Sequence, residues 1–233
     1  MAVRTVFRAN ADTLNFVEKI DVDFQWYPGF SVSQKQKSIK SLHENLKKIY
    51  KNDNILEISS KGLNELGIKL SAFNLMITTV KNKRTFSVES AFQSSKMFEH
   101  GGPYIDLLNV TSREAKKDIR LKSSGKLVGF KFYNQEWPLE PKTLFYDWLY
   151  MNALYKQKEL SKVILNYDSF TDIEFNPRKS VNCQACSAAL FVSLSRRNLI
   201  DETMKSVNNY LSVISAANNK INSEEKQINF LNL

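Results

Sequence analysis

The sequence predicts an α+β fold in which helices and short strands alternate within one compact domain. Runs of β-prone residues at 55–60 and 76–80 lie between stretches whose apolar residues recur at helical spacing, 33–51 and 143–155. A length of 233 residues suits one domain, or one domain with an added lobe. With 42% hydrophobic residues the chain can bury a sizeable core, and 7 glycines and 5 prolines indicate few linkers.

The N-terminal part, residues 1–54, is expected to form an extension that carries a basic helix. Residues 3–30 predict short strands and turns, and 33–51 predict the helix. Its apolar stripe has spacings of 3, 4 and 3 and consists of Ile39, Leu42, Leu46 and Ile49. The other faces are rich in lysine, with Lys35, Lys37, Lys40, Lys47, Lys48 and Lys51. Such a face is usually only solvated, and the alternative is a surface that follows a phosphate backbone.

Residues 88–98 predict a buried helix with three polar side chains on one face. Ser87 is suited to cap this helix, because a serine oxygen can accept from free backbone N–H groups. Glu89, Gln93 and Lys96 are spaced i, i+4 and i+7, while most other positions are apolar. A buried carboxylate beside an amine is either an internal ion pair or the wall of a catalytic pocket, and this stretch alone does not separate the two.

Other elements are expected on both sides of this helix. A hairpin over 75–87 leads into it. After it, Gly101 and Gly102 can end the helix or let the backbone approach a ligand closely. The core helix predicted at 143–155 carries one acid, Asp147, which is either hydrogen-bonded structure or a site residue.

A polar loop at 175–185 precedes a further apolar helix. A loop rich in hydrogen-bond donors at a helix N-terminus can bind an anion, and otherwise it is a capped loop. Cys183 and Cys186 form one CxxC pair. Because the chain has no second pair and contains only two histidines, reduced thiols are favoured over a zinc site.

Taken in order, these elements predict that residues 55–198 form the core domain and that 199–233 form a helical tail.

Charge and hydropathy restrict the partners and the compartment. The net charge of +9 and a pI near 9.4 are compatible with a polyanionic partner, and equally with a basic surface that binds nothing. No basic segment at the N-terminus is followed by a long apolar run, and no stretch approaches the ~20 apolar residues of a membrane helix. A cytoplasmic protein without membrane association and without a cofactor is expected.

Several short motifs occur in an order that resembles the NADAR family of N-glycoside hydrolases. In chain order they are Leu70-Ser71-Ala72-Phe73, Val88-Glu89 with Gln93 and Lys96, Thr111 with Ala115 and Arg120, the helix 143–155 and the loop 175–185. Together they cover roughly residues 55–195. Each motif is short, and it is their shared order that makes the resemblance specific.

Over longer stretches, the sequence is similar to one branch of this family, the NADAR antitoxins that accompany DarT-type DNA ADP-ribosyltransferase toxins. The stretches that carry this are 33–39, 101–104, 137–141, 145–150 and the 175–185 loop. The resemblance implies a compact α+β domain, mostly helical, with a small sheet and a hairpin. It also implies removal of ADP-ribose from guanine in DNA, with ADP-ribose as the product ligand and a cognate toxin as a partner.

The resemblance assigns roles to three residues. Glu89 matches the catalytic glutamate of the family, Lys96 its helix lysine, and Lys83 the hairpin lysine that precedes the glutamate. The branch that acts on riboflavin intermediates carries a functional tryptophan before the long helix, where this chain has Lys142 or Thr143. That branch also has an aspartate in the late loop, where the nearest residue here is Lys179, so the departures argue against a riboflavin-type substrate.

The chemistry of an N-glycosidic bond explains why these residue types are suitable. Positive charge develops at C1′ of the sugar, and a carboxylate such as Glu89 can stabilise it or activate water. Alternatively, an unprotonated amine attacks C1′ and opens the ring as a Schiff base, for which Lys83 and Lys96 are the candidates. Residues 176–184, with the glycine pair, are expected to hold the diphosphate. The substrate-binding candidates are Ser71, Asn74, Gln93, Gly101, Gly102, Tyr104, Asp147, Lys179 and Asn182.

Two other functions fit the same sequence. A DNA glycosylase that excises a modified base in phage defence would cleave the same type of bond. A non-catalytic module that binds the toxin would need no reactive glutamate at all.

Overall fold

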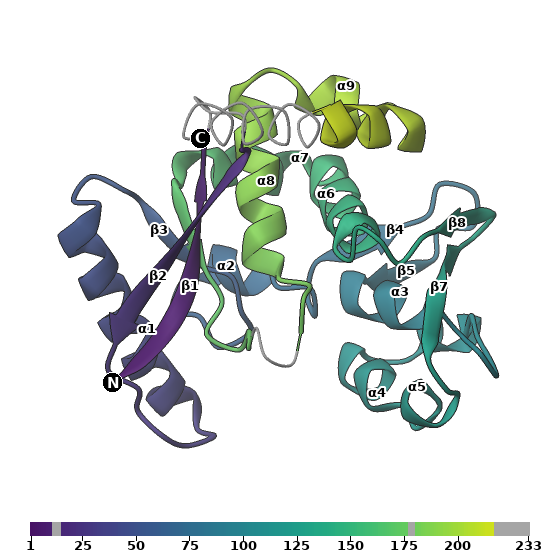
Figure 1. Ribbon diagram of the computed structural model, residues 1–233, viewed down its shortest axis with the longest axis horizontal. Helices are drawn as coiled ribbons and strands as arrows, with labels where there is room; N and C mark the ends of the chain where they lie inside the picture. The colour runs from purple at the N-terminus through teal and green to yellow at the C-terminus, as the bar shows by residue number, and fades with distance from the viewer. Residues whose placement is uncertain (11–14, 177–179, 217–233) are drawn as a thin grey trace, which may run out of the picture.

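The computed structural model describes residues 1–10, 15–176 and 180–216 and confirms the α+β class (Figure 1). A four-stranded sheet lies toward one end of the molecule and a three-stranded sheet toward the other, with two long helices between them (Figure 1). None of the helices in the described ranges is long and apolar enough to span a membrane.

The four-stranded sheet has the strand order β2-β1-β9-β3. Strands β1 (Ala2–Ala9) and β2 (Val17–Phe24) pair antiparallel along their whole length, from Ala2 opposite Phe24 to Ala9 opposite Val17. Strand β9 (Ser169–Thr171) is antiparallel to β1 and parallel to β3 (Ile55–Glu57). The N-terminal strands therefore share a sheet with segments far along the chain.

Helices cover both faces of this sheet. Helix α1 (Val32–Ile49) packs its apolar stripe against one face, where Ile39, Leu42 and Leu46 are buried with Val6. Helix α8 (Gln184–Arg196) lies against the other face, where Phe7 joins the main core. Adjacent residues of a strand point to opposite faces, so Val6 and Phe7 are both buried because both faces are covered.

The predicted basic helix is confirmed, and Lys37, Lys40, Lys47 and Lys48 are exposed on it. Lys35 is mostly covered and pairs with Glu174 at 3.1 Å, and Ile49 of the predicted apolar stripe is exposed instead of buried.

The second half of the fold is built around small antiparallel pairs. Strands β4 (Met76–Thr78) and β5 (Thr85–Ser87) form the predicted hairpin. The three-stranded sheet consists of β6 (Lys96–Phe98), β7 (Leu127–Phe132) and β8 (Gln135–Trp137). Shorter helices lie around these strands, namely α3 (Val88–Ser94), η1 (Ile105–Asn109), α4 (Ser112–Lys117) and α5 (Arg120–Ser123).

Helix α6 (Leu144–Lys156) connects the two halves, because it contacts both α8 and α3. Its aromatic side chains meet those of the three-stranded sheet, with Phe145 5.0 Å from Phe130 and 5.4 Å from Trp137 between ring centroids. The remaining elements are α2 (Glu65–Lys69), α7 (Lys158–Val163), η2 (Ile164–Asn166) and α9 (Ile200–Met204). Residues 207–216 are also helical, and the rest of the predicted tail lies outside the described residues.

The prediction of one helix over 88–98 was wrong at its C-terminal end. Helix α3 stops at Ser94, and Lys96 begins strand β6 instead. The hydroxyls of Ser94 and Ser95 both donate to the carbonyl of Ala91, at 2.9 and 2.7 Å, which competes with continuation of the helix. The carbonyl of Ser95 then accepts from the backbone of Lys131 at 2.7 Å, which starts the pairing with β7.

Replacing Gly67 by alanine is expected to destabilise the junction between α2 and β3. A Cβ at Gly67 would lie 1.9 Å from the carbonyl oxygen of Glu57, so the helix or the strand has to move. Overpacking of this kind costs about 1–3 kcal/mol of unfolding free energy, which urea denaturation measures. The control is Gly62→Ala, where the nearest atom would be 3.3 Å away, and equal losses in both variants would contradict the packing argument.

Candidate active site

The first turn of α3 is fixed by hydrogen bonds to the segment 70–75. The backbone N–H of Val88 donates to the carbonyl of Leu75, and that of Glu89 to the carbonyl of Ala72, both at 2.9 Å. Ser87 caps the helix as predicted, because its Oγ accepts from the N–H of Ser90 at 3.0 Å. These backbone hydrogen bonds therefore fix the position of Glu89 independently of the contacts that its side chain makes.

Helix α4 is held beside α3 by a serine at its start. Ser112 Oγ donates to the carbonyl of Phe73 at 2.8 Å and lies 2.7 Å from Ser87 Oγ. The predicted capping box is present, with Thr111 and Glu114 each satisfying a backbone N–H of the other. This orientation of α4 directs Lys116 toward Glu89.

Glu89 lies between an amide and two amines. Its side chain is 6% exposed and its Oε1 accepts from Gln93 Nε2 at 2.9 Å. The Nζ of Lys116 is 3.7 Å from the same oxygen. Burial lowers the pKa of Lys96, the charge of Glu89 opposes this, and the charge of Lys116 adds to it. The site therefore combines a buried carboxylate with an amine whose pKa is lowered from its ordinary value.

Aromatic side chains border these charged groups. The Nζ of Lys96 is 4.9 Å from the ring centroid of Phe92, and that of Lys116 is 5.1 Å from the ring centroid of Phe73. The ring of Tyr146, from α6, meets Phe92 edge-on at 5.1 Å. Burial, and then the negative charge of Glu89, raise the pKa of Tyr146 well above its ordinary value, so this phenol stays neutral.

A second polar group lies at the start of the late loop, around Asp172. Gln184 Nε2 donates to Asp172 Oδ2 at 3.0 Å and to the carbonyl of Ile58 at 2.6 Å, while its Oε1 accepts from Ala72 N at 2.7 Å. Burial and the neighbouring carboxyl of Glu57 raise the pKa of Asp172 to about 8. Gln184 thereby ties the N-terminus of α8 to the segment that receives α3.

Comparison with known protein families identifies the chain. The model of the DarT1-associated NADAR antitoxin family matches residues 2–225. The chain belongs to this family of NADAR antitoxins. A search of curated proteins finds no match. Since NADAR proteins are in general N-glycosidases, the carboxylate and amines around Glu89 are the natural candidates for an N-glycosidase site.

The residues that the family motif assigns lie in different surroundings. Glu89, Gln93 and Lys96 are together, although Lys96 reaches the site from β6. Lys83 is exposed in the turn of the β4–β5 hairpin, with a φ of 51°, and no contact joins it to Glu89 in the part of the chain described.

Four predicted binding residues of the NADAR chain are engaged in internal contacts. Ser71 Oγ and Asn74 Nδ2 both donate to the carbonyl of Ile68, at 2.8 and 2.9 Å. The hydroxyl of Tyr104 bonds to that of Ser124. Asp147 is buried between α6 and α8, where Ser187 Oγ donates to it at 2.6 Å.

The glycine pair packs against the backbone of Lys96. Gly102 has a φ of +86°, and a Cβ on it would lie 2.2 Å from the carbonyl oxygen of Lys96. A Cβ on Gly101 would lie 2.3 Å from the hydroxyl of Tyr104. The positive φ and the close backbone approach explain the need for glycine at Gly102, which positions β6 and its lysine, whereas at Gly101 the side chain of Tyr104 could move aside.

Three buried side-chain oxygens have no hydrogen-bond partner among the described residues: one is Gln34 Oε1, on α1, and the other two belong to predicted binding residues. These two are Gln93 Oε1, beside Glu89, and Asn182 Oδ1, in the late loop. Buried acceptors of this kind are usually satisfied, so each is available to a ligand donor. Lys179 lies outside the described residues. No group of three metal-ligating side chains that could hold a metal ion occurs among the described residues.

Lys116 and Tyr146 also belong to the site and were missed by sequence reasoning, whereas Phe73 and Gln184 lie in predicted segments but were not named as site residues. The capping box fixed the start of α4, so the place of Lys116 on that helix was predictable. Its contact with Glu89 was not, because that contact depends on how α4 is oriented by Ser112.

The pKa of Asp147 leads to a prediction about stability and pH. Burial raises this pKa from 3.8 to about 6, so the folded protein binds the proton more tightly than the unfolded chain does. The contribution of Asp147 is therefore favourable below about pH 4 and is lost as the pH rises through about 6. From the difference in pKa, this loss amounts to about 3 kcal/mol of unfolding free energy.

Asp147→Asn is expected to lack this decrease between pH 4 and pH 7 in urea denaturation. The exposed residue Asp23 supplies the control, since Asp23→Asn should retain the decrease seen in the wild type. An identical pH profile for Asp147→Asn and wild type would show that the carboxyl titrates normally in the folded protein.

Proposed function

We propose that this NADAR antitoxin hydrolyses the N-glycosidic bond between ADP-ribose and guanine in DNA, and in this way reverses the modification made by a DNA ADP-ribosyltransferase toxin. The observation that supports this most is the buried Glu89 carboxylate, held against a lysine of lowered pKa. The family membership supports the antitoxin role, and the net charge of +9 is compatible with a DNA substrate.

In this mechanism Glu89 acts on the sugar carbon that loses guanine. As the bond to guanine breaks, C1′ becomes positively charged, and a carboxylate in a dry site stabilises that charge strongly. Gln93 and Lys116 hold one oxygen of Glu89, at 2.9 and 3.7 Å, and leave the other for the substrate or for a water molecule.

Lys96 is our candidate for the nucleophile. Its neutral amine forms a bond to C1′ while the bond to guanine breaks, and guanine leaves with a proton. The ribose ring opens to a Schiff base, and a water molecule then hydrolyses the imine, which releases ADP-ribose and restores the amine. Burial beside a second cation favours the neutral amine that the attack requires. Lys83 is the alternative nucleophile, and it reaches the substrate only if the hairpin turn lies over the sugar.

The unpaired acceptors suggest how the substrate is held. Gln93 Oε1 can accept from a ribose hydroxyl or a guanine N–H next to Glu89. The N-terminal end of α8 can bind the diphosphate, because helix N-termini attract anions, while Asn182 Oδ1 can accept from a sugar hydroxyl or a base N–H. The partly exposed ring of Phe73 offers a surface on which a base can stack.

Replacing Glu89 by glutamine is expected to slow release of ADP-ribose from guanine-modified DNA by at least about 100-fold, since it removes a catalytic carboxylate at constant shape. Mass spectrometry of the products measures this, and free ADP-ribose rather than an abasic site is expected. Borohydride should trap a covalent adduct on Lys96, which Lys96→Ala abolishes. The exposed pair Glu65 and Lys69, on α2, supplies the matched controls Glu65→Gln and Lys69→Ala.

Several outcomes would revise this proposal. An adduct on Lys83 would transfer the nucleophile to the hairpin. Full activity in folded Glu89→Gln, Lys96→Ala and Lys83→Ala proteins would overturn it. If the Glu89→Gln antitoxin still protected cells that express the toxin, the chain would act by binding the toxin rather than by catalysis.

Lys116 is expected to set the pH at which the enzyme becomes active. If neutral Lys96 is the nucleophile, kcat/KM rises with pH until the pKa of Lys96 is passed. The positive charge of Lys116 lowers that pKa, so Lys116→Met should raise it and move the inflection to higher pH. Lys117→Met, one position along and also exposed, is the control and should leave the profile unchanged. A shift to lower pH would contradict the electrostatic role.

A further inference from the structure

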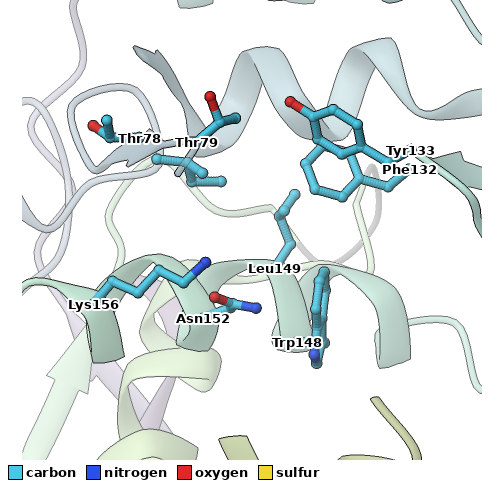
Figure 2. A pocket seen from close by; sticks show the side chains of 9 residues that line it. Thr78, Thr79, Phe132, Tyr133, Trp148, Leu149, Asn152 and Lys156 are labelled. Atoms are coloured by element: carbon cyan, nitrogen blue, oxygen red, sulfur yellow. The ribbon is translucent and has the colours of Figure 1, made fainter. Parts of the chain in front are cut away.

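A pocket of about 170 Å³ lies apart from Glu89, between the hairpin, the β7–β8 turn and the outer side of α6 (Figure 2). It is lined by Ile77, Thr78, Thr79, Phe132, Tyr133, Trp148, Leu149, Asn152 and Lys156. Neither Glu89 nor Lys96 is among these residues, so the pocket is a separate feature. Strand β5, the second strand of the hairpin, ends at Ser87, two positions before Glu89, so one hairpin borders both places.

Three aromatic rings form one part of the pocket wall. Phe132 meets Tyr133 edge-on, with ring centroids 4.8 Å apart, and meets Trp148 in the same way at 6.4 Å. Figure 2 shows Phe132 and Tyr133 on one side of the space and Trp148 on the other, where α6 passes. Rings arranged in this way offer flat apolar surfaces to a planar ligand.

Two polar side chains from α6 complete the wall. Asn152 and Lys156 are spaced i, i+4 and extend from the same helix toward the pocket (Figure 2). Neither side chain has a hydrogen bond or an ion pair within the described parts of the chain. An amide offers both a donor and an acceptor, and an ammonium offers positive charge, so both are free to bind a ligand.

The backbone at Tyr133 is in a conformation that tyrosine rarely adopts. Tyr133 is the first residue of the two-residue turn between Phe132 and Gln135, and its φ is 51°. Turns of this type favour glycine, asparagine or aspartate at positions with positive φ. The side chain is 56% exposed, so burial does not offset the strain. Strained residues of this kind are often kept where they contact a ligand.

The size and charge of the pocket restrict its ligand. Its volume is below the roughly 300–1,000 Å³ of pockets that enclose a whole drug-sized molecule, so it accommodates one ring system. No acidic residue lines it. The basic turn of the hairpin, which contains Lys81, Lys83 and Arg84, borders it, because the backbone N–H of Thr79 donates to the carbonyl of Arg84 at 2.9 Å.

We infer that this pocket binds one nucleobase of single-stranded DNA that lies beside the modified guanine. The base stacks against Tyr133 and Trp148, Asn152 bonds to its edge, and Lys156 and the hairpin lysines bind the adjoining phosphates. The inference rests on the proposed function, since it supplies a second contact for the DNA substrate. It also explains why exposed lysines and a strained tyrosine occur together around the hairpin.

The test is the affinity for an unmodified single-stranded 12-nucleotide DNA, measured by fluorescence anisotropy. Tyr133→Gly removes the ring and relieves the backbone, so the protein stays folded while affinity falls about tenfold, within the range of one lost stacked base. Asn152→Ala should weaken binding to a smaller extent. Lys156→Ala should weaken it more at low salt than at high salt.

Two matched controls isolate the pocket. Asn198 also has a positive φ, of 58°, so Asn198→Gly makes the same backbone change elsewhere and should leave affinity unchanged. Lys158 is an exposed lysine that lies over the ring of Tyr155 and outside the pocket, so Lys158→Ala should have less effect than Lys156→Ala. Photo-crosslinking of an oligonucleotide with 5-iododeoxyuridine should label Tyr133 or Trp148.

The outcomes separate this inference from the proposed chemistry. Binding of unmodified DNA needs no catalysis, so Glu89→Gln should bind this 12-mer as the wild type does. If the wild type does not bind the 12-mer, or if Tyr133→Gly binds as well as the wild type, the inference is overturned. It is also overturned if Tyr133→Gly loses affinity for the toxin protein alone, because the pocket would then be a protein contact.

Discussion

The segment 70–75 fixes the positions of four helices by hydrogen bonds to its backbone. It pairs with no strand, so its buried N–H and C=O groups need other partners, and each group left unpaired would cost about 1–3 kcal/mol. The partners come from α3, α4, α6 and α8: Val88 N, Glu89 N, Ser112 Oγ, Tyr150 Oη and Gln184 Oε1. Helices from four distant parts of the sequence are therefore aligned by one short irregular segment.

This arrangement explains how the NADAR chain tolerates a buried carboxylate. Burying an unpaired charge is costly, and the cost falls only when hydrogen bonds and opposite charges are held in place. Helix α3 supplies Gln93, α4 supplies Lys116 and β6 supplies Lys96, and the segment 70–75 positions the first two helices directly. A change in any of these contacts would leave Glu89 buried without compensation, so stability and the proposed chemistry depend on the same bonds.

The sequence alone predicted those parts of the site that depend on residues close together in the chain. Helical spacing placed Gln93 four residues from Glu89, and the two side chains are bonded at 2.9 Å. Helical spacing also placed Lys96 beside Glu89, but for the wrong reason. The helix ends at Ser94, and the lysine lies on a strand. The hydroxyls of Ser94 and Ser95 both bond to the carbonyl of Ala91 at this point, and the two consecutive serines were the local signal of a helix end.

Contacts between distant segments were not predictable in the same way. The ring of Tyr146 approaches the site from a helix that begins more than 50 residues after Glu89, and no periodicity in the sequence links the two. The first strands were underestimated as short, because β1 is covered on both faces and so lacks the simple alternation of a half-buried strand. Local patterns specify elements, whereas the site depends on how the segment 70–75 joins them.

The electrostatics of Lys96 also constrain where the rest of the substrate lies. Burial and Lys116 favour its neutral form, while the charge of Glu89 opposes them. A diphosphate placed beside Lys96 would add negative charge and favour the protonated amine, which cannot attack C1′.

The phosphates are therefore better held at a distance, at the N-terminal end of α8. There the helix dipole is favourable to an anion. Burial keeps Tyr146 neutral, so it adds no charge beside Glu89. On the proposed mechanism, anion binding at the start of α8, away from Lys96, is the condition under which the protein can bind ADP-ribose without favouring the protonated form of that amine.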